Sequence, residues 1–259
     1  MSLKRISFWI LVIFLLIAIF SPIISPYEVT DFSFDPLLSP SIKHLLGTGE
    51  MGHDLYTLLL YGFRVTITIS LVSGFFSTVF GSLLAIIAVY YKGFLDKVIL
   101  RISDMFLMIP EIIVILFFAT FAKPSLENTL YAIVFFSWGR VFRIVRSKLI
   151  SVIGKNKVKY TLLLKGNVFD IFKKLWYDIK PILATMFILQ CSKAAVYETT
   201  LSYFGIGDPL IKTWGKMIRT AMNYEGIFYD GVYIWYLLPP IFCICIFIIS
   251  LSCLTFEER

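Results

Sequence analysis

Long runs of apolar residues, separated by short charged stretches, constrain this chain more than any other feature. A helix needs about 20 apolar residues to cross a hydrocarbon core of about 30 Å, so runs of this length suit a lipid bilayer. Only 16% of the residues are charged, whereas about a quarter are charged in a soluble domain. Six segments qualify as spans: residues 6–25, 65–91, 102–122, 129–147, 182–204 and 232–253. We therefore predict an all-α integral membrane protein with about six transmembrane helices.

The first apolar run, which follows Lys4 and Arg5, also resembles a signal peptide. It is longer than the apolar region of about 7–15 residues that signal peptides carry, and no A-x-A-like cleavage site follows it. We expect it to be an uncleaved first span.

The basic residues are unevenly shared between the loops that join these spans. Lys and Arg are frequent at the N-terminus, between residues 92 and 101, and between residues 140 and 180. The other loops instead collect acidic residues, among them Asp31, Glu50 and Glu225. Since loops rich in Lys and Arg stay in the cytoplasm, this pattern predicts a multi-pass protein of the cell membrane with both termini cytoplasmic. The net charge of +7 does not indicate nucleic-acid binding, because the basic residues lie between apolar runs.

The longest predicted inner segment, residues 148–181, is too charged to span a membrane but is patterned like a helix. Its apolar residues recur at helical spacing, and they are Leu164, Val168, Ile171, Phe172, Leu175 and Ile179. Three interpretations remain open on the residues alone. The segment lies on the inner leaflet, packs beneath the bundle, or presents its apolar ridge to a cytoplasmic partner.

Residues suited to catalysis or metal binding are scarce. The four cysteines lie in or beside apolar runs, where a thiol packs as a small apolar group. His44, Met51, His53 and Asp54 offer donors for a metal, but two histidines nine residues apart in an irregular loop do not make a metal-site motif, and we expect none. No G-x-x-x-x-G-K-[ST] loop is present, so we expect no bound ATP and no cofactor in this chain. We expect no catalytic residues and no enzyme.

Glu111, Lys193 and Glu198 fall in the interior of predicted spans. Glu111 directly follows Pro110, and its carboxyl group either attracts a solute in the translocation path or bonds to backbone groups that the proline frees. We favour the second role for Glu111 and keep Glu111 and Glu198 as path candidates. Lys193 lies five residues before Glu198, so the two are not placed to pair along one helical face. A proton-coupled secondary transporter that uses Glu111 and Glu198 is the alternative of a different class.

Four motifs occur in order along residues 44–253. They are Leu46-Gly47-Thr48-Gly49-Glu50-Met51-Gly52-His53-Asp54, then Arg101-Ile102-Ser103-Asp104 with Pro110, then Trp138 with Arg143 and Arg146, and finally Glu198-Thr199-Thr200-Leu201-Ser202-Tyr203-Phe204-Gly205-Ile206-Gly207 followed by Trp214-Gly215-Lys216-Met217. With these motifs the chain resembles the inner-membrane permeases of binding-protein-dependent ABC importers, in the dipeptide/oligopeptide/nickel branch. His53 departs from that pattern, which commonly has arginine there. The outer loop motif residues singled out by the resemblance are Gly47, Thr48, Gly52, His53 and Asp54.

The resemblance implies a type I ABC importer permease-like bundle with a cytoplasmic coupling helix. Its parts would be a first transmembrane helix with an outer loop (1–63), a permease core of five helices (64–253) that includes the coupling loop 148–181, and a cytoplasmic tail (254–259). Coupling to the ATPase would fall on Tyr160, Lys165, Gly166, Phe169 and Phe172. The family usually has E-A-A-x-x-x-G in this loop, whereas residues 160–166 read Tyr-Thr-Leu-Leu-Leu-Lys-Gly.

The implied function is the ATP-driven import of peptides or a similar small solute by alternating access. The implied partners are a second homologous permease subunit, two cytoplasmic ATPase subunits that carry ATP and Mg, and an extracytoplasmic solute-binding protein. Import of nickel or a metal–metallophore complex is the alternative within the same family.

Overall fold

The computed structural model describes residues 3–121, 123–153, 168–229 and 231–255, and within these ranges it consists of helices and loops without a strand. The helices are α1 (Leu3–Ile24), α2 (Leu55–Tyr91), α3 (Gly93–Met108), α4 (Glu111–Phe121), α5 (Leu126–Ile153), α7 (Val168–Tyr203), α8 (Trp214–Asn223), α9 (Val232–Tyr236) and α10 (Leu238–Thr255). The predicted all-α fold is confirmed.

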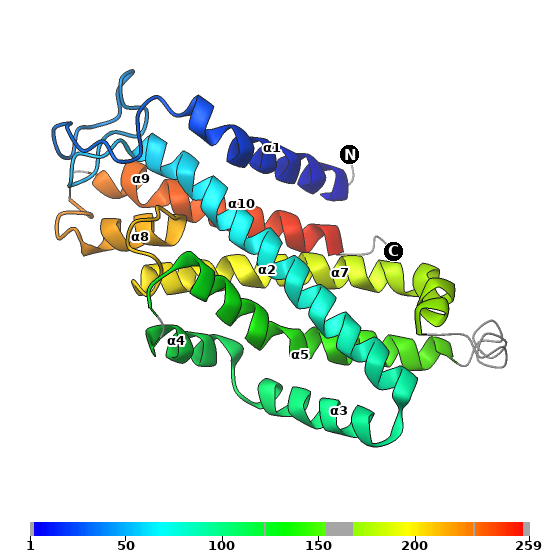
Figure 1. Ribbon diagram of the computed structural model, residues 1–259. Helices are drawn as coiled ribbons and strands as arrows, with labels where there is room; N and C mark the ends of the chain where they lie inside the picture. Colours follow the sequence, from blue (N-terminus) through cyan, green and yellow to red (C-terminus); the bar gives the residue numbers. More distant parts are fainter. Residues whose placement is uncertain (1–2, 122, 154–167, 230, 256–259) are drawn as a thin grey trace.

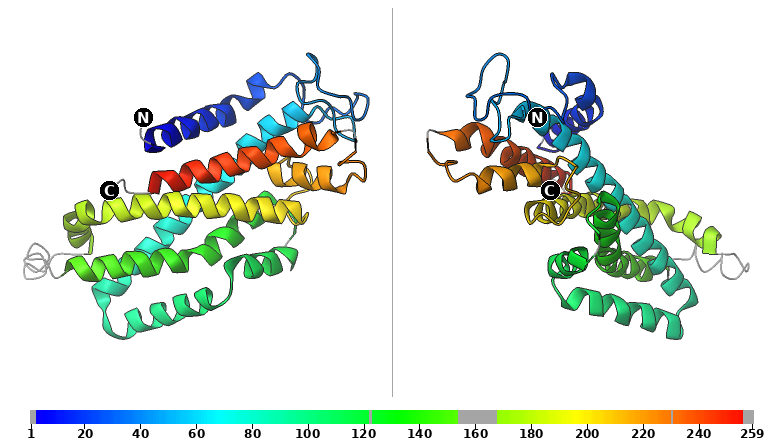
Figure 2. Two further views of the ribbon diagram at one scale, coloured as in Figure 1. Left: turned by 180° about the vertical axis from the view of Figure 1, so that it is seen from behind. Right: turned by 60° about the vertical axis from the view of Figure 1, so that its left-hand side comes forward.

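The long helices lie side by side in one bundle, with α2 crossing through its middle (Figures 1 and 2). Helix α2 contacts α1, α5 and α7, while α10 lies between α1 and α7 and α3 packs along α5. Over its 37 residues α2 is about 55 Å long, because an α-helix rises about 1.5 Å per residue. It is therefore the element that connects most of the bundle.

Small residues on α2 allow its neighbours to approach closely. A Cβ atom added at Gly74 would lie 2.5 Å from the Cys191 Sγ atom of α7, and one added at Gly81 would lie 2.7 Å from the Trp138 carbonyl oxygen of α5. Ser70 adds a hydrogen bond from its hydroxyl group to the Cys191 carbonyl oxygen, at 2.7 Å. Small residues and interhelical hydrogen bonds of this kind hold membrane helices together, since lipid supplies little hydrophobic driving force between them.

Four helical segments in the described ranges are long and apolar enough to cross a membrane: Leu3–Ile24, Leu55–Tyr91, Leu175–Tyr203 and Leu238–Thr255. A fifth span results if α3 and α4 are counted as one. The predicted span 129–147 lies within α5, which is long enough but carries Arg140, Arg143 and Arg146. The sequence thus predicts about six spans, and length and composition in the structure support four or five.

The predicted span 102–122 is not one straight helix, which corrects the sequence-based expectation. Helices α3 and α4 meet at an angle of 86° across Ile109 and Pro110. Proline has no N–H group for the helix ladder and pushes the preceding residue away from helical geometry. Ile109 is accordingly extended, with φ −101° and ψ 137°. The predicted span 232–253 is also divided, into the short helix α9 and the longer α10.

The two ends of the bundle are formed by different parts of the chain. The start of α1 and the end of α10 lie at one end, together with the end of α5 and the start of α7 (Figure 1); we call this the termini end. The opposite end, which we call the loop end, carries residues 25–54, α8 and α9. This arrangement agrees with the predicted placement of both termini on one side of the membrane.

Ion pairs join α3 to α5 through residues of two sequence motifs. The Arg146 guanidinium donates two hydrogen bonds of 2.6 Å to the Asp96 carboxylate. Arg143 pairs with Asp104, whose carboxylate also lies 3.8 Å from Arg101. The arginines of α5 therefore hold α3 in place, and Arg101 and Asp104 of the second motif face each other within α3.

Candidate functional site

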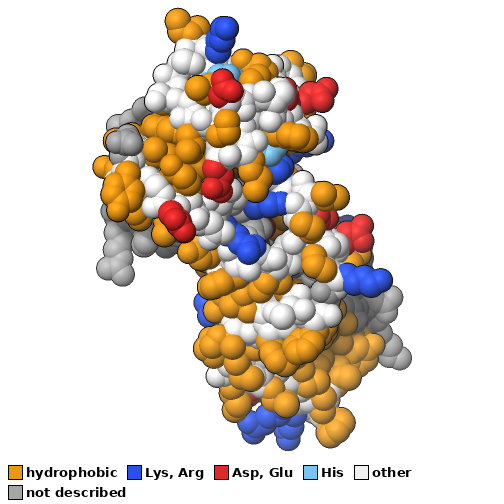
Figure 3. All heavy atoms as spheres, turned by 90° about the vertical axis from the view of Figure 1, so that its left-hand side faces the viewer, with side chains coloured by type: hydrophobic (Ala, Val, Ile, Leu, Met, Phe, Trp, Pro, Cys, Tyr) orange, Lys and Arg blue, Asp and Glu red, His pale blue; other side chains and the backbone are white. Residues whose placement is uncertain are grey.

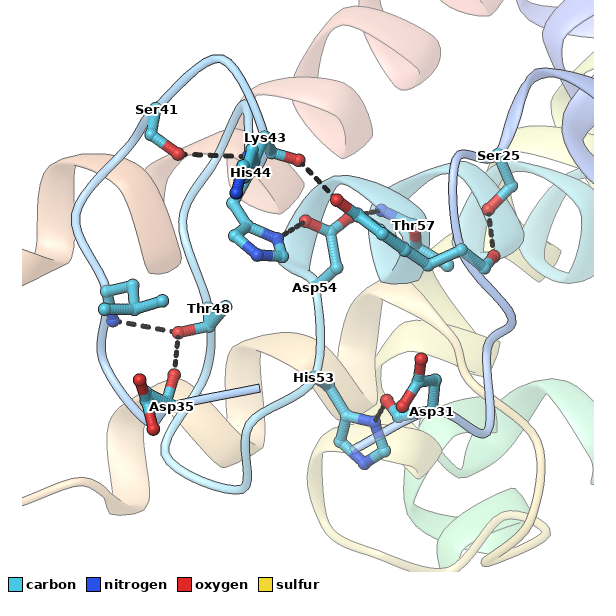
Figure 4. A network of polar contacts seen from close by, with 12 residues as sticks. Ser25, Asp31, Asp35, Ser41, Lys43, His44, Thr48, His53, Asp54 and Thr57 are labelled. Atoms are coloured by element: carbon cyan, nitrogen blue, oxygen red, sulfur yellow. Dashed lines mark hydrogen bonds and ion pairs between the residues drawn. The ribbon is translucent and has the colours of Figure 1, made fainter. Parts of the chain in front are cut away.

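The outer loop motif forms a hydrogen-bonded unit at the start of α2 (Figure 4). The Asp54 carboxylate accepts a hydrogen bond of 2.8 Å from the Thr57 backbone N–H, which is the N-cap interaction of α2. Its other oxygen accepts one of 2.9 Å from His44 Nδ1. Both side chains are buried. Asp54 and His44 therefore fix where the loop joins the helix.

Thr48, Gly47 and Gly52 fold the rest of this motif. The buried Thr48 hydroxyl group donates to the Asp35 carbonyl oxygen at 2.7 Å and accepts from the Leu38 N–H at 2.8 Å. Gly47 and Gly52 have φ values of +70° and +73°, a region that favours glycine. A Cβ atom at Gly52 would also lie 2.3 Å from the Phe34 carbonyl oxygen. These motif residues thus shape the loop.

His53 is oriented apart from His44. Its Nδ1 atom donates a hydrogen bond of 2.8 Å to the Asp31 carbonyl oxygen, which leaves Nε2 as the nitrogen that titrates (Figure 4). Burial lowers the pKa of His53, and the positive charges of Lys212 and Lys216 lower it further, while the Asp31 contacts oppose this. Among the residues that the structure describes, no three His, Cys, Asp or Glu side chains group as metal ligands.

A cavity of about 280 Å³ opens at the loop end beside His53. Lys212 and Lys216 line it together with Met51, Leu58 and Tyr236. The cavity lies where the outer loop motif meets the loop before α8, so it brings together the first and the last of the four sequence motifs. The sequence did not reveal this cavity, because the residues that line it are separated by more than 150 positions.

Glu111 and Lys193 form an ion pair between α4 and α7. The Tyr197 hydroxyl group donates a second hydrogen bond, of 3.0 Å, to the same Glu111 oxygen. The carboxylate thus has side-chain partners, where the sequence favoured backbone groups freed by Pro110. The other Glu111 oxygen is buried and has no hydrogen-bond partner among the described residues. Opposite charges in two predicted spans were the signal for this pair. The sequence did not show that they meet, because α4 and α7 are far apart along the chain.

Glu198 lies in a separate polar contact between α2 and α7. It is 1% exposed and accepts hydrogen bonds from the Thr66 hydroxyl group at 3.0 Å and from the Ser202 hydroxyl group at 2.7 Å. The structure does not bring it together with Glu111 in one hydrogen-bonded group. Roles of Glu111 and Glu198 in a translocation path stay predictions.

The last motif packs α8 against the bundle. Trp214 is fully buried, and its indole N–H donates a hydrogen bond of 3.2 Å to the Leu59 carbonyl oxygen of α2. Gly62 of α2 makes room for the Trp214 ring, which a Cβ atom there would approach to 2.3 Å. Gly215 of α8 makes room for α7, since a Cβ atom there would lie 2.3 Å from the Thr199 carbonyl oxygen. This motif therefore holds α8, and with it one wall of the cavity, in place.

The predicted coupling residues are only partly covered by the structure. Tyr160, Lys165 and Gly166 lie outside the described residues, and Phe169 and Phe172 fall in the first turns of α7. Further along the same apolar ridge, Leu175 and Ile179 are buried in a cluster with Val145 and Leu149 of α5. This part of the ridge packs beneath the bundle, as one of the three interpretations held. The coupling role stays a prediction.

Comparison with known protein families decides between the classes of transporter. Residues 77–256 match the family described as "binding-protein-dependent transport system inner membrane component". The chain belongs to this family. Residues 3–40 match the N-terminal transmembrane domain of oligopeptide transport permease C. The resemblance seen in the four motifs is confirmed, and the chain is a multi-pass inner membrane component of such a system.

Several curated proteins are similar to this inner membrane component over most of its length. The dipeptide transport system permease protein DppC of Alkalihalophilus pseudofirmus is 29% identical, over 86% of this chain and 74% of its own. The protein of the same name in Haemophilus influenzae is 29% identical, over 81% and 74%. The di/tripeptide transport system permease protein DppC of Pseudomonas aeruginosa is 27% identical, over 86% and 76%.

Proposed function

We propose that this inner membrane component imports peptides as one permease subunit of an ATP-driven ABC importer. The observation that carries the proposal is its similarity to dipeptide and di/tripeptide permeases across more than four-fifths of the chain. The family match supports the same role. The matched residues include the broken span formed by α3 and α4, and the loop-end helices α8 and α9.

The proposal includes partners that the chain alone does not supply. A second homologous permease subunit completes the path, and two cytoplasmic ATPase subunits bind ATP and Mg and hydrolyse the nucleotide. An extracytoplasmic solute-binding protein delivers the peptide to the loop end. The termini end then faces the cytoplasm, in agreement with its Lys and Arg residues and the positive-inside rule.

The structure suggests how such a subunit can move. The 86° break between α3 and α4 separates two helical pieces, and the Glu111–Lys193 ion pair ties the second piece to α7. Switching between inward-open and outward-open states by rigid-body rotation of helices needs discrete joints of this kind. We infer that the break at Pro110 is such a joint, because a proline there prevents a continuous hydrogen-bond ladder.

Neither of the two alternatives, another solute or another energy source, is favoured. A nickel or metallophore importer has no support from the similar proteins above, whose names specify peptides. A proton-coupled secondary transporter needs a shared site for Glu111 and Glu198, whereas each has its own separate partners. The family match also points to a binding-protein-dependent system.

Purification and transport together test this function. We expect a tagged chain, expressed with its neighbouring genes, to bring down a second permease and ATPase subunits from detergent-solubilised membranes. Proteoliposomes in which the ATPase subunits face the lumen, with the binding protein outside, should accumulate a labelled dipeptide only when the lumen contains ATP. Vanadate should stop the uptake. Peptide uptake driven by a proton gradient, without ATPase subunits and insensitive to vanadate, would contradict the proposal.

A further inference from the structure

The cavity at the loop end concentrates positive charge. Lys212 and Lys216 line one side of it and His53 lines another. Burial lowers the pKa values of both lysines, and the neighbouring charge of Lys212 adds to the effect on Lys216. Viewed from the loop end, Lys and Arg side chains gather near the middle of the face (Figure 3). The positive charge of Lys212 therefore acts on both Lys216 and His53, and that of Lys216 acts on His53 as well.

This charge is not balanced by ion pairs within the described residues. Lys216 Nζ donates a hydrogen bond to the Pro209 carbonyl oxygen, and Asp208 attracts it without forming a salt bridge. Neither Lys212 nor Lys216 takes part in any of the ion pairs found in the described ranges. Partly buried cations without an anionic partner are unfavourable, and an anion placed among them reduces that cost.

The surroundings of the lysines suit an anion that carries an apolar body. The cavity lies at the N-terminal end of α8, where the helix dipole also favours negative charge. Leu58, Met217 and Tyr236 supply an apolar floor. A single water needs about 10–15 Å³ of such space, so 280 Å³ is far larger than one carboxylate group or one water requires. It falls just below the volumes of about 300–1,000 Å³ that small-molecule sites occupy.

We propose that this basic cavity, formed by Lys212, Lys216 and His53, binds the carboxylate group of a small solute such as the C-terminal carboxylate of a short peptide. The inference rests on the proposed peptide import and adds a binding site on the permease itself. The two lysines hold the carboxylate oxygens, His53 adds a donor when its Nε2 is protonated, and the apolar floor contacts the body of the solute. Because His53 belongs to the outer loop motif and Lys216 to α8, the bound solute also bridges these two parts of the chain.

Ligand-observed saturation-transfer NMR on the whole transporter in nanodiscs, without the binding protein, tests the site. The probes are dialanine and dialanine amide, which differ in the terminal carboxylate. We expect dialanine to bind at least about tenfold more tightly than the amide. Lys212→Gln combined with Lys216→Gln should remove this preference, and Lys212→Arg with Lys216→Arg should restore it. Lys43→Gln is the matched control, because Lys43 is an exposed lysine of the outer loop at the same end of the molecule and does not line the cavity.

The outcomes separate this proposal from the proposed function. Equal binding of both probes, or an unchanged preference in the double Gln variant, overturns the carboxylate site even if the complex transports peptides. Weakened docking of the binding protein in that variant, with no dialanine binding to the wild-type complex, also overturns it and assigns the cavity to an acidic side chain of that protein. Failure of the wild-type complex to transport any peptide instead contradicts the proposed function. Gel filtration of each variant complex shows that assembly is intact.

Discussion

Most motif residues at the loop end stabilise the local fold, even though the motif they form is typical of a transporter family. Asp54 caps α2 and holds His44, and Gly52 permits a backbone conformation that other residues rarely adopt. His53 and Lys216 differ from them, because their side chains line a cavity. The same short motif therefore contains both the supports of the loop and a group that is able to meet a solute.

Replacing Asp54 tests the architectural role. Asp54→Ala removes the cap of α2 and leaves His44 without its buried partner, so we expect a loss of about 1–2 kcal/mol in stability. The thermal unfolding temperature of the purified complex should fall by several degrees. Asp35→Ala is the control, because only the backbone carbonyl oxygen of the exposed Asp35 contacts Thr48. Equal effects of the two variants would show that the cap is not what stabilises the loop.

His53 should make stability depend on pH. Its pKa is lowered by burial, and the groups that face it are Asp31, Lys212 and Lys216. Between the lowered pKa and the unfolded value of about 6.5 the unfolded chain binds more protons, so stability falls as the pH drops through this window. We expect His53→Gln to flatten the unfolding temperature between pH 7 and pH 5, relative to wild type. An unchanged slope in the variant would assign the pH dependence to other groups.

Helices in this protein are positioned by local close approach and by paired charges. The small residues of α2 bring α5 and α7 near, the Asp96–Arg146 and Asp104–Arg143 pairs fix α3 on α5, and Glu111–Lys193 fixes α4 on α7. An apolar surface in lipid offers little preference for one neighbour over another. Contacts of these two kinds therefore determine which helix lies beside which.

The close approach of α2 and α5 can be tested with a pair of glycines. Gly81→Ala places a methyl group 2.7 Å from the Trp138 carbonyl oxygen, so the helices must separate. Gly139→Ala in α5 meets no atom closer than 3.6 Å and should be neutral or stabilising by up to about 1 kcal/mol, the helix-propensity difference. Unfolding temperatures of the two variants should therefore move in opposite directions. A stable Gly81→Ala variant would show that α2 and α5 have room to move apart.

The Glu111–Lys193 pair gives a second prediction at this scale. Glu111→Gln or Lys193→Met alone leaves one charge without its partner, and we expect each to cost about 1–3 kcal/mol, less than a fully buried pair because Lys193 is one-fifth exposed. The double variant should recover part of that loss. Unfolding in a graded denaturant series, analysed as a double-mutant cycle, measures the coupling. Additive effects would mean that the two side chains do not stabilise each other.

The two ends of the molecule are built differently. At the loop end the chain folds back on itself around a cavity, while at the termini end the helices α5 and α7 extend beyond α1 and α10 (Figure 2). The family match covers both ends. In the proposed importer, events at the ATPases must therefore reach the loop end through the long helices.

Coupling is tested by charge at the start of α7. Phe169→Glu and Phe172→Glu should uncouple ATP hydrolysis from peptide uptake in the reconstituted complex, while the subunit still inserts and assembles. An acidic group there disfavours packing of the predicted apolar ridge against an ATPase. The ratio of uptake to hydrolysis should fall at least about tenfold, and Phe169→Leu should retain it. Normal ratios in both Glu variants would place the docking surface elsewhere.

The sequence was informative about helices and the family but not about long-range partners. Run length placed a helix in each of the six predicted spans, of which length and composition support four or five, and the motifs identified the family. Pro110 indicated that backbone hydrogen bonds are lost there, but not a bend of 86°, because an apolar run gives no measure of bending. The pairing of Glu111 with Lys193 and the meeting of His53 with Lys216 depend on how helices pack, which periodicity within one helix does not encode.

The length of α2 has a mechanical consequence. At about 55 Å it exceeds the hydrocarbon thickness of about 30 Å, so both of its ends project beyond the bilayer core or the helix is strongly tilted. A rigid rod that pivots near its middle moves its two ends in opposite directions. One end holds Asp54 and Leu58 beside the cavity, and the other, at Tyr91, leads directly into α3. A small rotation of this lever would widen the protein at one membrane surface while narrowing it at the other, without bending any helix.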